Sequence, residues 1–193
     1  MLNTAMLDAD RAMLLVIDVQ SKLLPHVEGA EAMLTSAVQL IRGTRVFELP
    51  AMATVQYVRG LGPTHPAINR LLTEYGVETL EKASFSACGD EAIREKLRGI
   101  DRPQVIVTGI ETHVCVQQSV LDLLSMDHQV FVCADAVGSR KGLDWEMALA
   151  RMRAGGAAVT TVEAALFELC HLSGTPRFRQ LLEVVKEPEK VTV

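Results

Sequence analysis

The chain has 193 residues, a formal net charge of −5 and 49% hydrophobic residues. This length predicts one domain, residues 1–193, with a core large enough for helices on both faces of a sheet. The acidic balance, without a lysine- or arginine-rich run, argues against a nucleic-acid partner, and no apolar stretch reaches the ~20 residues of a membrane span.

Short apolar runs alternate with helix-length segments along the chain. The runs are residues 12–17, 51–57, 77–82, 104–109, 129–135 and 157–162. Amphipathic helical patterns cover residues 30–41, 66–76, 89–99, 113–124, 143–156, 163–170 and 176–186. Strands that are apolar on both faces and separated by helices indicate parallel βαβ units. The predicted fold is therefore a three-layer α/β/α domain with a six-stranded parallel sheet.

Polar residues end several of these apolar runs. Parallel strands place their carboxyl ends at one edge of the sheet, where ligands bind. The first run ends at Asp18, the third at Lys82 and the fifth at Asp135, and the fourth leads through Gly109 to Cys115. An acid, an amine and a thiol are therefore expected at one edge of the sheet. For Asp135 we favour a role in shaping a turn over a catalytic one.

Cys115 lies in what the pattern predicts to be the first turn of a helix. A cysteine attacks as its thiolate, which a nearby cation or a helix N-terminus stabilises. Lys82 would supply the cation, and Asp18 would take the thiol proton and pass it to a leaving amine. Backbone N–H groups of residues 110–115 would hold an oxyanion. This arrangement predicts acyl transfer from a small amide or related C–N bond to sulfur, followed by hydrolysis of the thioester.

Four stretches, LLVIDVQ, EKASFSAC, VTGIETHVCVQQSVLDLL and ADAVGSR, together resemble the isochorismatase-like cysteine hydrolases. The resemblance covers nearly the whole chain and is closest to the isochorismatase-domain-containing subgroup, similar members of which are sometimes labelled mitochondrion-associated ribonucleases. It implies a Rossmann-like hydrolase fold, with Asp18, Lys82 and Cys115 at the positions of the family's Asp–Lys–Cys triad. It also implies a non-proline cis peptide between Ile110 and Glu111, at the oxyanion hole. Isochorismatases proper lack this cysteine, so its presence favours the amidase-type branches.

The segment after the second apolar run departs from one branch of that family. Nicotinamidases carry an Asp-x-His metal motif there, whereas this chain reads QYVRGLGPTHP, with Gln56, Tyr57 and Val58 at the start and His65 beside a proline. We therefore expect no metal and no other cofactor, and nicotinamide is a disfavoured substrate.

Four further residues are candidates for substrate binding from their position alone: Gln20, Tyr57, Phe85 and His113. For His113, a role beside the helix start or in a subunit contact is an equally good reading.

The resemblance also bears on partners. It implies a small-molecule substrate and a homo-oligomer, which the apolar helices near the end of the chain fit. Two alternatives to a hydrolase stay open. One is an RNA-processing protein, which the acidic balance disfavours. The other is a non-catalytic binding or assembly protein, which an intact triad disfavours.

The cysteines and the first residues bear on the compartment. Four widely spaced cysteines without a CxxC pair indicate a reducing environment and predict neither a disulfide scaffold nor a zinc knuckle. Residues 1–10 contain no basic leader and no Arg-rich amphipathic pattern, so no targeting peptide is expected. We expect an intracellular, cytoplasmic protein, with a mitochondrial association left open.

Overall fold

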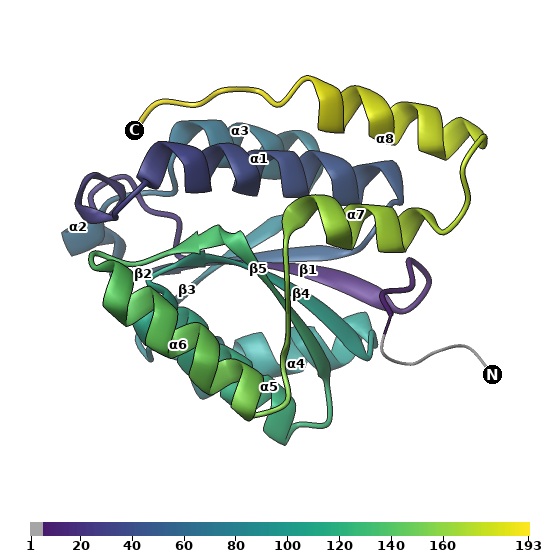
Figure 1. The fold of residues 1–193 in the computed structure, drawn as a ribbon. Helices are drawn as coiled ribbons and strands as arrows, with labels where there is room; N and C mark the ends of the chain where they lie inside the picture. Colours follow the sequence, from purple (N-terminus) through teal and green to yellow (C-terminus); the bar gives the residue numbers. More distant parts are fainter. Residues whose placement is uncertain (1–5) are drawn as a thin grey trace.

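The computed structural model describes residues 6–193 (Figure 1). Its centre is a six-stranded sheet in the order β3-β2-β1-β4-β5-β6, with all neighbours parallel. The strands are β1 (Ala12–Ile17), β2 (Ala51–Gln56), β3 (Glu78–Lys82), β4 (Gln104–Ile110), β5 (Gln129–Gly138) and β6 (Ala158–Thr160). The strand order reverses its direction between β1 and β4, and in such sheets this is the point where ligands bind.

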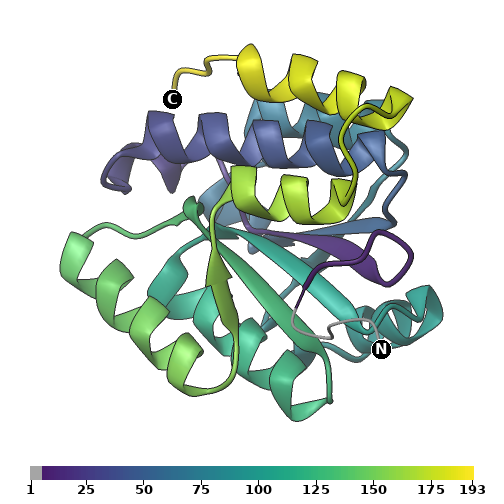
Figure 2. The same ribbon diagram turned by 45° about the vertical axis from the view of Figure 1, so that its right-hand side comes forward.

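Helices cover both faces of the sheet (Figures 1 and 2). One face carries α1 (Ala30–Val46), α3 (Pro66–Glu74), α7 (Val162–Cys170) and α8 (Pro176–Lys186), and the other carries α4 (Glu91–Ile100), α5 (Gln117–Ser125) and α6 (Gly142–Ala154). The predicted three-layer α/β/α fold is confirmed.

Strand β1 shows why the sheet needs both helical layers. Its six side chains are at most 1% exposed. Leu14 and Val16 pack into the core beneath α1, whereas Met13, Leu15 and Ile17 pack into the core beneath α5. Alternate residues of a strand point to opposite faces, so a strand that is apolar throughout is stable only between two layers.

Polar residues fix where several helices begin. The Asp90 carboxylate accepts hydrogen bonds from the backbone N–H groups of Ala92 and Ile93 and so caps α4. Thr161 and Thr175 cap α7 and α8 in the same way. Such caps satisfy N–H groups that have no partner within the helix.

The structure corrects the predicted end of the fifth strand. β5 continues to Gly138, three residues beyond the predicted end at Asp135, and its pairing with β4 shifts register between Val107 and Gly109. The Asp135 carboxylate accepts a hydrogen bond from the backbone N–H of Val162, 2.9 Å away, at the start of α7. Asp135 therefore holds a helix in place from within a strand rather than ending that strand.

Four short turns were not resolved by the sequence pattern. They are η1 (Leu24–His26), α2 (Val58–Leu61), η2 (Ala87–Gly89) and the π-helical turn η3 (Thr112–Val116). Each is too short to show helical periodicity. Because η3 precedes α5, the regular helix begins at Gln117 rather than near His113.

Two observations bear on the chain's surroundings. Among the helices of residues 6–193, none has both the length and the apolar character needed to cross a bilayer. The prediction that residues 1–10 lack a targeting peptide concerns, in part, residues 1–5, which lie outside the described residues.

Candidate active site

The predicted acid and amine form a buried ion pair. Asp18 directly follows β1 and Lys82 ends β3, with β2 between them. Lys82 Nζ lies 2.6 Å from Asp18 Oδ2, and neither side chain is exposed. Burying one of these charges without the other would be costly, so each stabilises the other in place.

Both members of the pair have additional hydrogen-bond partners. Thr54 Oγ1 donates to Asp18 Oδ1 over 2.8 Å. The Lys82 ammonium also donates to the carbonyl oxygens of Ser84 and Phe85, over 3.1 and 3.0 Å. These contacts hold the carboxylate and the ammonium in position.

Gln56 connects the ion pair to the predicted nucleophile. Its side-chain oxygen Oε1 accepts hydrogen bonds from Lys82 Nζ and from Cys115 Sγ, each over 3.1 Å. The sequence placed Gln56 in the second apolar run, at the start of the segment QYVRGLGPTHP, but indicated no role for it. The departure from the Asp-x-His motif was the available signal, because an amide stands where nicotinamidases have a metal-binding carboxylate.

Gln20 holds Gln56 in turn. Its Nε2 donates to the carbonyl oxygens of Gln56 and Gly62, over 3.0 and 2.6 Å, and its Oε1 accepts from the Gln56 N–H over 2.9 Å. Gln20 is fully buried. With both amide hydrogens bound to the backbone, these contacts favour a structural role over the predicted contact with substrate.

The protonation of Cys115 differs from what the sequence predicted. Cys115 lies in the π-helical turn η3, which continues directly into α5. The pKa of this thiol is raised to about 12, first by burial and then by the Asp18 carboxylate, and Lys82 offsets only part of this rise. The expected lowering by Lys82 is outweighed chiefly by burial and then by the charge of Asp18, with which that ammonium already pairs. The thiol is therefore neutral at rest.

The turn before Cys115 has the backbone feature that the family resemblance implied. The peptide bond between Ile110 and Glu111 is cis. The Glu111 carboxylate accepts hydrogen bonds from the backbone N–H and from Nε of Arg140, over 3.2 and 2.9 Å. The hydroxyl of Thr112, the next residue, is buried and has no partner within residues 6–193. The oxyanion-hole role of this turn stays a prediction.

The other three candidates for substrate binding lie toward the surface. The side chains of Tyr57 and Phe85 are 60% and 53% exposed. His113 is partly exposed, with Nδ1 3.0 Å from Ser139 Oγ and Nε2 3.9 Å from Asp144 Oδ2. Within the described residues, the side chains of these three residues have no hydrogen bond to Asp18, Lys82 or Cys115, and only the backbone carbonyl of Phe85 contacts the cluster, through Lys82. Their contact with substrate stays a prediction.

The described residues hold no cluster of three His, Cys, Asp or Glu side chains arranged as metal ligands. His65, the histidine after the second strand, instead caps α3: its Nδ1 accepts from the backbone N–H of Ala67 over 3.3 Å.

The parallel sheet, its strand order and the acid, amine and thiol at its carboxyl edge define an isochorismatase-like hydrolase fold. The model of the isochorismatase domain family matches residues 12–164. The chain therefore belongs to the isochorismatase family, as the sequence motifs predicted.

Relatives of this chain carry different names. Isochorismatase domain-containing protein 2A of Mus musculus is 33% identical over 180 residues, which cover 93% of this chain and 84% of that protein. A structure described as MAR1 ribonuclease from Caenorhabditis elegans has 32% identity, covers 97% of both chains and superposes with a TM-score of 0.89. YcaC from Pseudomonas aeruginosa, solved with hexane-2,5-diol and covalent acrylamide, has 25% identity, covers 95% of this chain and 93% of its own, and gives a TM-score of 0.87.

Proposed function

We propose that this protein is a metal-independent cysteine hydrolase that cleaves a small amide or related C–N bond through Cys115. One observation carries the proposal: Lys82 Nζ contacts both Asp18 and Gln56, and the same Gln56 oxygen accepts from Cys115 Sγ. A carboxylate, an ammonium and a thiol are thus connected by hydrogen bonds, in part through Gln56, at the carboxyl edge of the sheet.

The raised pKa of Cys115 determines how the first step proceeds. Because the thiol is neutral at rest, Asp18 removes its proton as sulfur bonds to the substrate carbonyl carbon. The new negative charge passes to the carbonyl oxygen, toward the backbone of residues 110–115. The Lys82 ammonium offsets the charge that moves through the cluster.

The remaining steps return the protein to its starting state. Protonated Asp18 donates its proton to the leaving nitrogen as the C–N bond breaks, and a thioester on Cys115 remains. A water molecule then attacks the thioester carbon and gives a proton to Asp18. The products are an amine or ammonia and a carboxylic acid, and sulfur regains its proton as the thioester breaks.

The covalent acrylamide of YcaC supports this proposal for the present chain. Acrylamide is a small primary amide with an electrophilic carbon that bonds to nucleophiles. A covalent adduct with acrylamide is the product expected when a reactive nucleophile lies beside a site for small amides, and YcaC has the same fold as this chain.

The proposal is tested by intact-mass measurement after the protein is exposed to a library of small amides and esters. We expect an acyl adduct on the wild type and on Cys170→Ala, the matched control for loss of a cysteine outside the cluster. We expect none on Cys115→Ala, and hydrolysis of the same compounds reduced by at least about 10³-fold in that variant. Equal turnover by Cys115→Ala and the wild type would overturn the proposal.

A second candidate, RNA cleavage, is favoured by the name of the Caenorhabditis elegans relative, which aligns over 97% of both chains. The net charge of −5 and a cluster suited to acyl transfer oppose it. Purified protein would be incubated with labelled RNA beside Cys115→Ala and Lys82→Ala. Cleavage lost in both variants would favour this candidate over the amidase. Cleavage that survives in both would point to a contaminant.

The exposed surface of α6 supports a homo-oligomer. Leu143 and Met147, one helical turn apart, are 67% and 52% exposed. Apolar side chains that recur at this spacing suit a contact with another subunit. Light scattering on the wild type and on Met147→Lys tests this: we expect the variant to have the smaller mass.

A further inference from the structure

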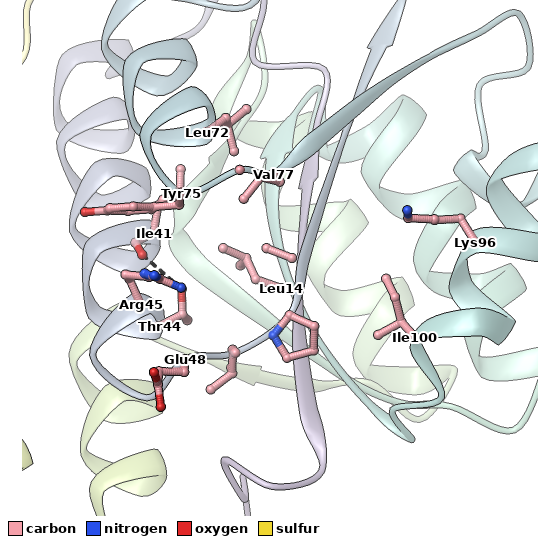
Figure 3. Close-up of a pocket in the computed structure, with 14 residues that line it drawn as sticks. Leu14, Ile41, Thr44, Arg45, Glu48, Leu72, Tyr75, Val77, Lys96 and Ile100 are labelled. Atoms are coloured by element: carbon pink, nitrogen blue, oxygen red, sulfur yellow. Dashed lines mark hydrogen bonds between the residues drawn. The ribbon is translucent and has the colours of Figure 1, made fainter.

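A hollow lies at the amino edge of the sheet, opposite the edge that carries Cys115. Its volume is about 300 Å³. Five apolar side chains form much of its wall: Leu14, Ile41, Leu72, Val77 and Ile100. The hollow opens between the carboxyl ends of α1 and α3 on one face of the sheet and the carboxyl end of α4 on the other (Figure 3).

The stagger of the strands produces this hollow. Strand β2 begins to pair with β1 at Ala51, opposite Leu14, the third residue of β1. Strand β3 begins to pair with β2 at Glu78, opposite Met52, the second residue of β2. The edge of the sheet therefore recedes toward β3, while the helices on both faces continue past it.

Charged groups stand at the mouth of the hollow (Figure 3). The Arg45 guanidinium lies over the ring of Tyr75, with Cζ 5.5 Å from the ring centre, and has no carboxylate within salt-bridge distance among residues 6–193. Lys96 stands on the opposite side and pairs with Glu78 over 2.6 Å. Stacking on the tyrosine holds the Arg45 fork in a fixed plane and leaves its donors available.

A wider hollow of about 510 Å³ adjoins the first and shares Arg45, Glu48 and Tyr75 with it. It adds Arg42 and Arg177 to the cationic groups. Two acids, Glu48 and Glu183, also line it. Glu48 forms a salt bridge with Arg177 over 3.6 Å. Three guanidinium groups thus face two carboxylates, which leaves a net positive charge beside an apolar hollow.

We propose that these two adjoining hollows form a second ligand site, called here the amino-edge site, for a small molecule that joins an apolar body to a carboxylate or phosphate. The apolar body lies in the first hollow against Leu14, Leu72 and Ile100. The anionic group lies at its mouth, where Arg45 donates to it. Arg guanidinium groups bind carboxylate and phosphate with two parallel hydrogen bonds, so the anion is the part that fixes the ligand's orientation.

The proposal is tested with para-fluorophenylacetate as the probe, followed by fluorine NMR. For a probe of this size we expect a dissociation constant on the order of 1 mM. The neutral analogue para-fluorophenylethanol, which keeps the ring and lacks the carboxylate, is expected to bind at least about tenfold more weakly. Inorganic phosphate and butyl phosphate, added as competitors, distinguish a free anion from one attached to an apolar body: displacement by butyl phosphate alone supports the proposal.

Variants locate the binding. Arg45→Gln removes one exposed cation and is expected to weaken probe binding about tenfold. Arg153→Gln removes an exposed arginine from α6, and is expected to leave binding within about twofold of the wild type. Ala51→Leu, which places a larger side chain in the first hollow without changing the charge, is expected to weaken binding as well.

Three outcomes would overturn the proposal: no binding of the probe at concentrations well above the expected constant, equal binding by Arg45→Gln and Arg153→Gln, or loss of binding when iodoacetamide has blocked Cys115. The last result would place the probe at the carboxyl edge instead. Because the probe is followed by binding and not by turnover, these outcomes do not depend on the proposed hydrolase activity.

Discussion

Strand β3 carries an ion pair at each end, and the two pairs have the same length. Glu78, the first residue of the strand, lies 2.6 Å from Lys96, and Lys82, the last residue, lies 2.6 Å from Asp18. The first pair is about half exposed, whereas the second has no exposed surface. Equal distances therefore correspond to different energetics: water and salt screen the first pair, whereas nothing but protein surrounds the second.

Burial also gives the Lys82–Asp18 pair a chemical consequence that the Lys96–Glu78 pair lacks. At the carboxyl edge, Lys82, Asp18, Gln56 and Cys115 are connected by hydrogen bonds and are buried. A change in the protonation of one of these groups therefore alters the electrostatic energy of the others. At the amino edge, Arg45 and Lys96 are exposed to solvent and suited to bind and release an ion. This contrast agrees with the two proposals, catalysis at the carboxyl edge of the sheet and reversible binding at the amino edge.

The largest effect is expected from removing the buried cation. Lys82→Met leaves Asp18 as an unpaired buried charge and should lower the free energy of unfolding by about 3–5 kcal/mol. Lys96→Met, the matched change at the other end of the strand, should cost at most about 1 kcal/mol. Urea denaturation measures both, and equal losses would remove the contrast between the two pairs.

Asp18→Asn separates the two roles of the carboxylate. Without a group to move the proton, amide hydrolysis should fall by about 10²–10⁴-fold. The same change removes a negative charge that raises the pKa of Cys115, so the pKa should fall and the thiol should react faster with iodoacetamide at neutral pH. Asp135→Asn, which changes an exposed acid outside the cluster, should alter neither quantity.

In this comparison, slower labelling of Asp18→Asn than of the wild type would contradict the assigned charge balance. Unchanged hydrolysis would contradict the assigned proton transfer.

The raised pKa of Cys115 predicts a loss of stability at high pH. Its folded pKa of about 12 exceeds the ordinary thiol value, so the folded state keeps a proton that the unfolded state releases. The stability this provides is complete below about pH 9 and declines, by roughly 1.4 kcal/mol per pH unit for one thiol, as pH rises toward the folded pKa. Burial also raises the pKa of Cys88, to about 11, and of Cys133, so both add to the decline.

Comparison of the wild type with Cys115→Ala isolates the contribution of Cys115. Thermal unfolding between neutral pH and about pH 11 should show a smaller decline in the free energy of unfolding for the variant than for the wild type, because the variant lacks the contribution of Cys115. A decline of the same slope in both proteins would mean that Cys115 ionises in the folded state as readily as in the unfolded chain.

The sequence predicted the fold well because each strand is a short apolar run and each long helix has a clear period. It also placed Asp18, Lys82 and Cys115 at one edge, because all three follow from where strands end. It missed the raised pKa of Cys115, which depends first on the burial of the thiol and then on the charges of Asp18 and Lys82 around it. It did not show the hydrogen bonds of Gln56 and Gln20, since contacts between segments distant in the chain leave no periodic signal in a sequence.

A smaller effect is expected at the joint between the loop after β3 and helix α5. Ser119 Oγ accepts from the Ala87 N–H over 2.8 Å and donates to the Cys115 carbonyl oxygen over 2.7 Å. Ser119→Ala should cost about 1–3 kcal/mol of stability, because two buried backbone groups lose their partner.

The same change bears on the active site. Ser119 connects the turn that carries Cys115 with the loop after β3, and carbonyl oxygens of that loop accept hydrogen bonds from Lys82. We expect hydrolysis to fall severalfold through kcat, with KM nearly unchanged, while Ser125→Ala, an exposed serine on the same helix, changes neither. A variant that loses stability but keeps full kcat would show that the cluster holds its geometry without this joint. The buried ion pair and Gln56 would then be sufficient to position the sulfur.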